Sequence, residues 1–420
     1  MTTAPEHERT GTEPERFPMY GPEFTNTPDR VYDRMRAQGD LVPVELVPGV
    51  PATLVLGYDA ALEILRDPDR FPRCSEVWEA EVGPECPVLP MLQARPNALF
   101  TNGAVHARFR SVIVDSLARV HPAALRGYAE NAADSLIDAF AGDGKADLIA
   151  QYTRPIPLLV FRELFGCPEE IAERLEEGMT GLLEGVDDPV QSLVMLEQAA
   201  RDLVALKRAK PGADVASWML RHPAGLDETE VTNQVGLLLA SGTEPENSLI
   251  ANGIRLLLSD DRFGGDLSGG SLPVEDALDE ILWTDPPISN YGPTFPRQDI
   301  NFHGYRLPAH QPVIISYTAA NTDPRRSGGC GGSSPHNDAS RSSANRKGNR
   351  AHLAFAGGPH TCPAKNHARL IASVAIEKLL DRLPEVELAV APEDLEWRPG
   401  AFHRGLTALP VTFPPAPGHP

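Results

Sequence analysis

The sequence predicts a mainly α-helical fold with a small β-rich subdomain. Its longer periodic segments repeat apolar residues at helical spacing, whereas alternating, strand-like segments are few and short. The 420 residues contain 41 prolines and 35 glycines, which divide the chain into many short elements. Hydrophobic residues at 41% and charged residues at 23% are close to globular averages, so we expect a folded protein rather than a disordered chain or a coiled coil.

Charge and composition limit the partners of the protein. The 38 Lys and Arg residues against 58 Asp and Glu residues give a net charge of −20, which repels nucleic acid and anionic lipid. No apolar run approaches the roughly 20 residues that span a bilayer, and residues 1–18 lack the pattern of a signal peptide. We therefore expect no nucleic-acid partner, no membrane and a cytoplasmic location. The five cysteines, an odd number spread along the chain, indicate reduced thiols rather than a disulfide framework.

The first elements follow residues 1–18, which we expect to form a flexible terminus. Pro28–Gln38 is a short amphipathic stretch with helical spacing. Leu41–Leu56 alternates in polarity and carries Pro and Gly, which favours a small antiparallel sheet. Tyr58–Arg66 has the spacing of another short helix.

A long central helix is predicted from Asp227 onward. Asp227 is an N-cap candidate three residues before Glu230, and apolar residues follow at helical spacing over roughly 30 positions. A helix that is apolar on most of its surface is expected to be buried. Pro245 removes the hydrogen bond to the Ser241 carbonyl, so we expect a kink at this point.

Further elements are predicted in the C-terminal half. Val274–Trp283 and His367–Leu383 have helical spacing, and Asp299–Phe302 and Val313–Tyr317 are strand-like. Residues 325–350 contain no Val, Ile, Leu, Met, Phe, Tyr or Trp. Such a segment cannot bury a core, so we expect a low-complexity, flexible loop.

A glycine-rich loop with one thiol, residues 355–364, precedes the last of these helices. A cysteine near a helix N-terminus has its thiolate stabilised by the helix dipole and free amides, which suits a nucleophile or a metal ligand. A buried structural cysteine after a turn is the alternative, because no second His or Cys lies at zinc spacing.

Phe355, Gly358, His360 and Cys362 resemble the haem-binding loop of cytochromes P450. The resemblance implies the cytochrome P450 fold, with Cys362 as the axial thiolate ligand of haem b, iron protoporphyrin IX. It also implies that Phe355 packs beside the sulfur and that the loop around Gly358 and His360 contacts the haem. Ala356 stands where the family usually has glycine, and its small side chain is compatible with a close approach to the porphyrin.

His106 and Arg110 are similar to the family residues that bind haem propionates. Without Cys362 the same pattern would indicate only a solvated helix face. A guanidinium suits a carboxylate because it offers a planar, charge-assisted fork. Relatives commonly place a further propionate-binding Arg where Thr294 stands, and nearby Arg297 is an open candidate for this role.

The long helix resembles the oxygen-activating helix of the family, whose usual pattern is small-Gly-x-acid-Thr. Glu244 matches the acid, but Pro245 occupies the threonine position and Glu246 follows. In one interpretation the distorted helix keeps a groove for dioxygen and water, with Glu244 or Glu246 handling protons. In the other, the site no longer activates dioxygen.

A second departure affects the Glu-x-x-Arg motif of the family. Glu280 supplies the acid, but Trp283 stands in place of the arginine. Glu280 must therefore find another donor, remain near water or be protonated, because a buried unpaired carboxylate is costly. The chain resembles an actinobacterial subgroup that has tryptophan at this position.

As a whole, the resemblance implies a single cytochrome P450 domain over residues 1–420 that acts as a haem-thiolate monooxygenase. It would insert one oxygen atom of dioxygen into a small hydrophobic organic substrate of the secondary-metabolite, fatty-acid, steroid or xenobiotic type. Electrons would come from a ferredoxin and an NAD(P)H-dependent ferredoxin reductase, and the basic residues of 325–350 would either help to dock this donor or form a solvated insertion. The alternatives are a non-oxygenating haem-thiolate ligand-binding or regulatory protein, and a peroxide-driven peroxygenase.

Overall fold

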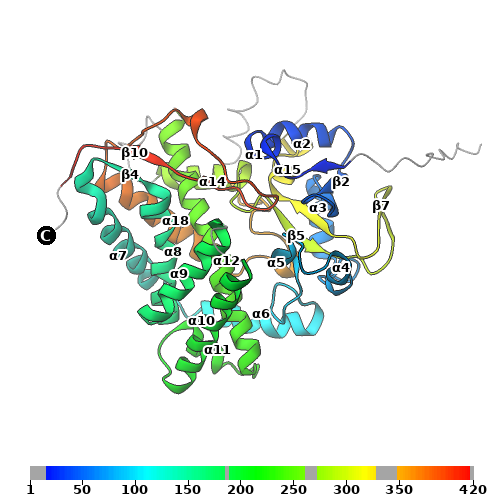
Figure 1. Ribbon diagram of the computed structural model, residues 1–420, viewed down its shortest axis with the longest axis horizontal. Helices are drawn as coiled ribbons and strands as arrows, with labels where there is room; N and C mark the ends of the chain where they lie inside the picture. The colour runs from blue at the N-terminus through cyan, green and yellow to red at the C-terminus, as the bar shows by residue number, and fades with distance from the viewer. Residues whose placement is uncertain (1–15, 185–188, 261–271, 328–347, 417–420) are drawn as a thin grey trace, which may run out of the picture.

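The structure is a computed structural model that describes residues 16–184, 189–260, 272–327 and 348–416 (Figure 1). Most of its long helices gather in one part of the molecule, and the largest sheet lies with the N-terminal helices in the other. The α-helices with described bounds are α1 (Pro22–Asn26), α2 (Pro28–Arg36), α3 (Tyr58–Arg66), α4 (Glu76–Val82), α5 (Leu89–Leu92), α6 (Gly103–Leu117), α7 (Pro122–Phe140), α8 (Pro155–Phe165), α9 (Glu169–Glu184), α10 (Pro189–Ala209), α11 (Val215–Leu220), α12 (Glu228–Ser259), α14 (Leu272–Thr284), α15 (Tyr317–Asn321), α16 (Pro324–Ser327) and α18 (Lys365–Arg382).

The strands form three small sheets. In the five-stranded sheet the order is β1-β2-β3-β8-β5, where β2 pairs antiparallel with β3 and β3 pairs parallel with β8. A three-stranded sheet has the order β4-β10-β9, and β6 and β7 form a hairpin. The strand bounds are β1 (Phe17–Pro18), β2 (Leu41–Glu45), β3 (Pro51–Val55), β4 (Lys145–Asp147), β5 (Asn290–Thr294), β6 (Ile300–Phe302), β7 (Tyr305–Leu307), β8 (Val313–Ser316), β9 (Glu387–Leu388) and β10 (Pro410–Thr412).

Helix α12 runs through the middle of the helical part and begins as predicted. The Asp227 side chain accepts from the Glu230 amide, and the Glu230 carboxylate accepts in return from the Asp227 amide, which completes a capping box. The helix is 32 residues long and continues through Pro245. Pro245 does not end α12, because packing against its neighbours holds the helix along its length. The kink expected at Pro245 stays a prediction.

The core around α12 also positions the loop that carries Cys362. Ile250 and Ile254 of α12 and Ile376 of α18 are fully buried in the same hydrophobic cluster. A side-chain carbon at Gly253 would lie 2.7 Å from Ile376 Cδ1, so glycine permits α12 and α18 to approach closely. Glu246, in the middle of α12, acts on the Cys362 thiol, so the cysteine loop lies near the middle of α12.

The mainly α-helical fold with its small β-rich part is confirmed, and most element predictions hold. The sheet predicted in Leu41–Leu56 is the β2–β3 hairpin, and Tyr58–Arg66 is α3. The strand predicted at Val313–Tyr317 ends at Ser316, where the Ser316 hydroxyl accepts from the Ala319 amide and caps α15.

Two predictions of flexibility need correction at their edges. Phe17 and Pro18 form β1, because they pair with β2, while residues 1–15 lie outside the described residues. Arg325 and Arg326 belong to α16, because ion pairs to acidic residues hold them, while residues 328–347 lie outside the described part.

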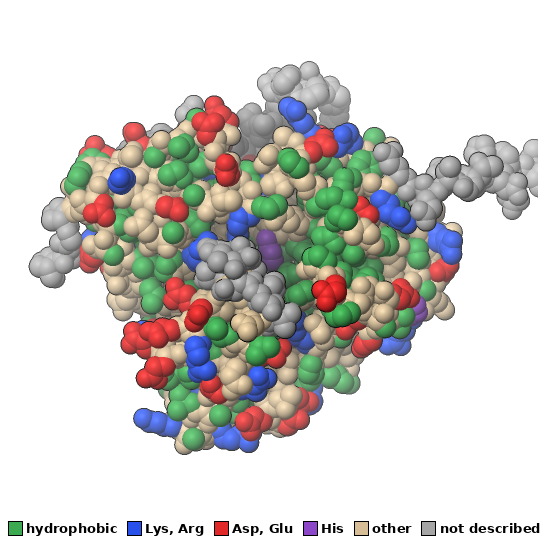
Figure 2. All heavy atoms as spheres, in the orientation of Figure 1, with side chains coloured by type: hydrophobic (Ala, Val, Ile, Leu, Met, Phe, Trp, Pro, Cys, Tyr) green, Lys and Arg blue, Asp and Glu red, His purple; other side chains and the backbone are tan. Residues whose placement is uncertain are grey.

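The surface carries both signs of charge. Figure 2 shows acidic and basic side chains spread over the visible face, with a larger hydrophobic area beside its centre. Within the described ranges, no helix is long and apolar enough to cross a membrane.

Candidate active site

The Cys362 loop is a short turn that leads into α18. A 3-10 turn at Gly358–His360 precedes Cys362, and α18 begins at Lys365. The Cys362 amide donates to the Phe355 carbonyl at 2.9 Å, which closes the loop. Burial raises the pKa of the Cys362 thiol, while a hydrogen bond from the Ala364 amide and the charge of Arg110 act to lower it. The Cys362 thiol therefore lies just before the N-terminus of α18, as the sequence predicts.

Backbone geometry explains the residue types of this loop. Gly358 has a φ of 65°, and a side-chain carbon there would overlap the Leu65 carbonyl oxygen at the end of α3. Only glycine fits this close approach. Ala356 also adopts a left-handed conformation, with a φ of 57°, so the alanine that replaces the usual glycine stands in a strained backbone position.

Helix α6 brings His106 and Arg110 to the loop. They are four residues apart and therefore share one helix face. The His106 and His360 rings lie 4.2 Å apart, and Arg110 donates to the Thr361 carbonyl. Burial lowers the pKa of both histidines, and nearby arginines, Arg110 among them, lower it further, so both rings are neutral at pH 7.

His106 has an unmet hydrogen-bonding group. His106 is only 6% exposed, and its Nε2 is buried without a hydrogen-bond partner among the described residues. A buried polar atom of this kind usually has a partner. The site therefore has capacity for a ligand that accepts or donates a hydrogen bond here.

The candidate Arg297 does not join this cluster. It is exposed, and its Nη2 lies 3.6 Å from Cys74 Sγ. Thr294 is buried, with its hydroxyl directed to the Val313 carbonyl at 3.5 Å. Arg73 is a buried arginine in the segment that pairs with Phe295, next to Thr294. The sequence pattern did not identify it, because it belongs to no motif of the loop or of α6.

Glu244 lies in a dense polar network in the middle of α12. Its residue is 3% exposed, and its carboxylate accepts from Ser248 Oγ at 2.9 Å and from Asn247 Nδ2 at 3.2 Å. Arg398, from the C-terminal segment, forms an ion pair with the same carboxylate. Thr153 donates to Asn247 Oδ1 at 2.7 Å and extends the network to the start of α8. Sequence reasoning missed Arg398, because no local spacing links it to Glu244.

Glu246 has a different environment from Glu244. It is 5% exposed, and its Oε1 has no hydrogen-bond partner within the described ranges. Burial raises its pKa well above the usual range for glutamate, against a smaller opposing effect of a hydrogen bond from the Ala372 amide. Burial thus favours the protonated form of Glu246, and the carboxyl lies close enough to Cys362 to influence the thiol.

Trp283 connects α14 to the segment before the cysteine loop. Its indole Nε1 donates to the Asn349 carbonyl at 2.7 Å, and its ring meets the His352 ring edge to face at 5.8 Å. His352 in turn lies 5.8 Å from the Phe355 ring. Tryptophan thus supplies one donor and a packing surface in place of an arginine. Glu280 is buried and has an interaction partner, so it is not an isolated charge.

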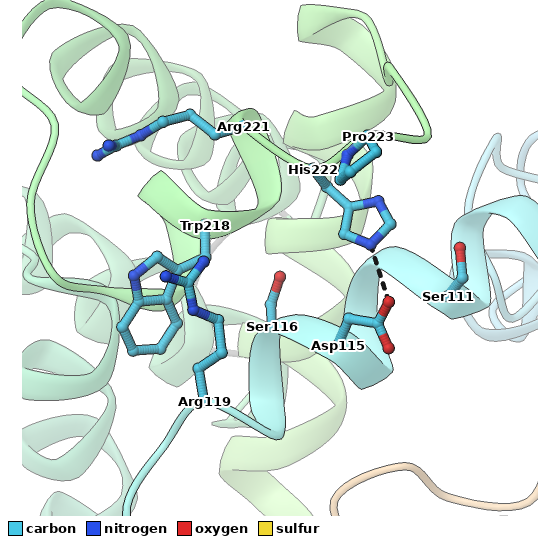
Figure 3. A pocket seen from close by; sticks show the side chains of 8 residues that line it. All are labelled: Ser111, Asp115, Ser116, Arg119, Trp218, Arg221, His222 and Pro223. Atoms are coloured by element: carbon cyan, nitrogen blue, oxygen red, sulfur yellow. Dashed lines mark hydrogen bonds and ion pairs between the residues drawn. The ribbon is translucent and has the colours of Figure 1, made fainter.

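A surface pocket between α6 and the end of α11 is separate from the predicted site residues (Figure 3). Figure 3 shows His222 directed at Asp115, with 3.0 Å between Nε2 and Oδ2, and Arg119 beside Trp218. None of the residues that line it belongs to the Cys362 loop or to the predicted pair His106 and Arg110. It therefore adds nothing to the candidate active site.

Comparisons with known proteins establish the family. No family model matches the chain. The cytochrome P450 monooxygenase PikC of Streptomyces venezuelae is 31% identical over 403 residues, which cover 94% of this chain and 92% of that protein. Biflaviolin synthase CYP158A1 of Streptomyces coelicolor is 30% identical over 402 residues, with 94% of each chain covered. The solved structure of CYP154C4 from Streptomyces sp. W2061 matches with a TM-score of 0.83 and 28% identity over 94% of this chain and 97% of that chain.

The chain therefore belongs to the cytochrome P450 family, and the predicted cytochrome P450 fold and enzyme class, a monooxygenase, are confirmed. Members of this family carry haem with a cysteine thiolate ligand.

Proposed function

We propose that this monooxygenase holds haem b with Cys362 as the axial thiolate ligand. One observation supports this assignment above the others: the Cys362 thiol, just before α18, lies beside a partly buried cluster formed by His106, Arg110 and His360. A thiol next to donors for carboxylates is the donor set that haem requires, because haem presents an iron and two propionates.

The residues present fit such a group. The unpartnered Nε2 of His106 and the guanidinium of Arg110 offer donors for propionate oxygens. Gly358, which has no side chain, lets the loop approach the end of α3 closely. When bound, haem supplies the activation of dioxygen, which no side chain of the chain can perform.

The protein's own part in the reaction is to handle protons. We propose that Glu244 accepts and releases a proton at its carboxylate, within the network of Ser248, Asn247 and Arg398. Glu246 is a second candidate, since burial raises its pKa and favours the protonated carboxyl, which can donate. Pro245 has no hydroxyl, so these two acids replace the threonine of the usual pattern.

We also propose the partners of the enzyme. A small hydrophobic organic substrate is supported by the family, whose relatives include a vitamin D(3) 25-hydroxylase. The electron donor proposed is a ferredoxin with an NAD(P)H-dependent reductase, and the location is cytoplasmic. Docking of the donor on the basic segment gains no support from the three arginines that are described, because all three form ion pairs with acidic residues: Arg325, Arg326 and Arg350.

The first experiment is the absorption spectrum of the reduced protein with carbon monoxide, for wild type and Cys362→Ala. We expect a strongly red-shifted Soret band in wild type and its loss in the variant. Haem without that band in wild type would contradict the thiolate assignment. Dioxygen-dependent and peroxide-dependent product formation, measured on the same preparation, then separates the monooxygenase from a peroxygenase and from a non-oxygenating protein.

A further inference from the structure

Arg73 is a buried cation that has no anionic partner within the described part of the chain. It lies between α3 and α4, is 4% exposed, and its Nη1 is buried without a hydrogen-bond partner among the described residues. Burying a guanidinium costs free energy unless an anion or several acceptors compensate. The groups that act on its charge in the described part of the chain are Tyr291 and Tyr317, and neither is a carboxylate. An anion bound to Arg73 would therefore compensate the cost of burying its charge.

The backbone around Arg73 fixes it beside the predicted propionate site. The Phe295 amide donates to the Pro72 carbonyl at 2.7 Å, which joins this segment to the end of β5, where Thr294 stands. On the other side, the Arg73 amide donates to Asn102 Oδ1 at 3.1 Å, next to the start of α6. Arg73 is thus held between the strand that lacks the usual arginine and the helix that carries His106.

The charge of Arg73 reaches the histidine cluster. Burial lowers the pKa of His106, and the charges of Arg110 and Arg73 lower it further. The His106 and His360 rings are 4.2 Å apart, so one guanidinium is close to both. Arg73, His106 and Arg110 consequently present donors to one region of the site.

We infer that Arg73 binds a haem propionate and supplies the cation that Thr294 does not provide. The inference rests on the proposed function, because the propionate belongs to the haem. The same guanidinium chemistry would suit the carboxylate of a substrate. We assign Arg73 to the propionate rather than to a substrate, because Arg73 adjoins the strand end where relatives place their propionate-binding arginine.

The test measures the rate at which the holoprotein loses haem to excess apomyoglobin. Arg73→Gln should lose protohaem about tenfold faster than wild type, because a charge-assisted contact is removed. Arg297→Gln is the matched control, since it removes an exposed arginine beside Cys74, and should leave the rate unchanged. With haem dimethyl ester, which has no carboxylates, wild type and Arg73→Gln should lose the group at the same rate.

Two further variants guard against a folding defect. Arg73→Lys keeps the charge but not the fork and should give an intermediate rate, and Arg73→Gln combined with Thr294→Arg should return toward the wild-type rate. Equal protohaem loss from wild type and Arg73→Gln would overturn the inference. The inference would also be overturned if Arg73→Gln accelerated the loss of haem dimethyl ester as much as the loss of protohaem. A third contrary result would be that Arg73→Gln binds myristic acid more weakly, but not methyl myristate, while the rate of haem loss is unchanged. A wild-type protein that binds no haem would contradict the proposed function itself. A wild-type protein that binds haem, with Arg73→Gln losing it at the same rate, would contradict only the role of Arg73.

Discussion

The guanidinium of Arg398 forms an ion pair with the carboxylate of Glu244, across 154 positions of sequence. Glu244 lies in the middle of α12 and Arg398 in the C-terminal segment, whose Gly405 leaves room for the guanidinium. A side-chain carbon at Gly405 would lie 2.6 Å from Ser248 Oγ, another member of the same network. The C-terminal segment thus supplies the cation that pairs with, and orients, the acid that we assign to proton handling.

Glu244→Gln should separate proton handling from haem binding. The amide cannot exchange a proton at neutral pH, so we expect product formation to fall roughly 100-fold while the reduced carbon monoxide spectrum is retained. Glu228→Gln, an exposed change in the first turn of the same helix, is the matched control and should leave turnover unchanged. Wild-type product yield per NADPH in Glu244→Gln would exclude Glu244 from the relay.

Removing the other partner of the pair should act on stability. Arg398→Gln leaves the Glu244 carboxylate buried without its cation, which we expect to lower the free energy of unfolding by roughly 3 kcal/mol. The measurement is urea unfolding at pH 7. In the Glu244→Gln background the same change should cost much less, because the buried charge is already gone. Equal costs in both backgrounds would show that the pair does not couple.

Gly358→Ala should disrupt the cysteine loop. The added carbon would overlap the backbone oxygen of Leu65, so we expect strong destabilisation and loss of bound haem. Gly83→Ala is the control, because Gly83 also has a left-handed φ, 73°, but no neighbouring atom within 4 Å. It should lose only about 1 kcal/mol from backbone strain. Similar thermal unfolding shifts for both variants would mean that the contact with α3 is not decisive.

His403 should make the protein less stable in acid. Burial and the charge of Arg398 lower its pKa from 6.5 to about 4. Between these values the unfolded chain binds a proton that the folded protein does not, so stability falls as the pH decreases from 6.5 toward 4, by at most about 3 kcal/mol. Urea unfolding at pH 7 and pH 4.5 should therefore show a smaller loss for His403→Gln than for wild type.

The control for this pH dependence is His121→Asn, an exposed position that caps α7. We expect this variant to lose as much stability as wild type between the two pH values. An unchanged loss in His403→Gln would assign the acid sensitivity to other groups.

Much of the site could be predicted from sequence because its requirements are local. The cap of α12 depends on Asp227 and Glu230, three residues apart, and the left-handed turn at Gly358 depends on that residue's own backbone. His106 and Arg110 share a helix face through their spacing alone. These features, with Cys362 before α18, are enough to indicate the family and the outline of the site from local sequence alone.

Only the tertiary structure decided how the departures from the family pattern are accommodated. Arg398 reaches Glu244, Trp283 donates to Asn349, and Arg73 lies against the strand end that carries Thr294. Each of these contacts joins segments distant in sequence. Sequence spacing cannot encode such contacts, because they depend on how helices and strands pack. Packing also determines that Glu244 is paired, whereas Glu246 is buried with one carboxyl oxygen that has no partner among the described residues.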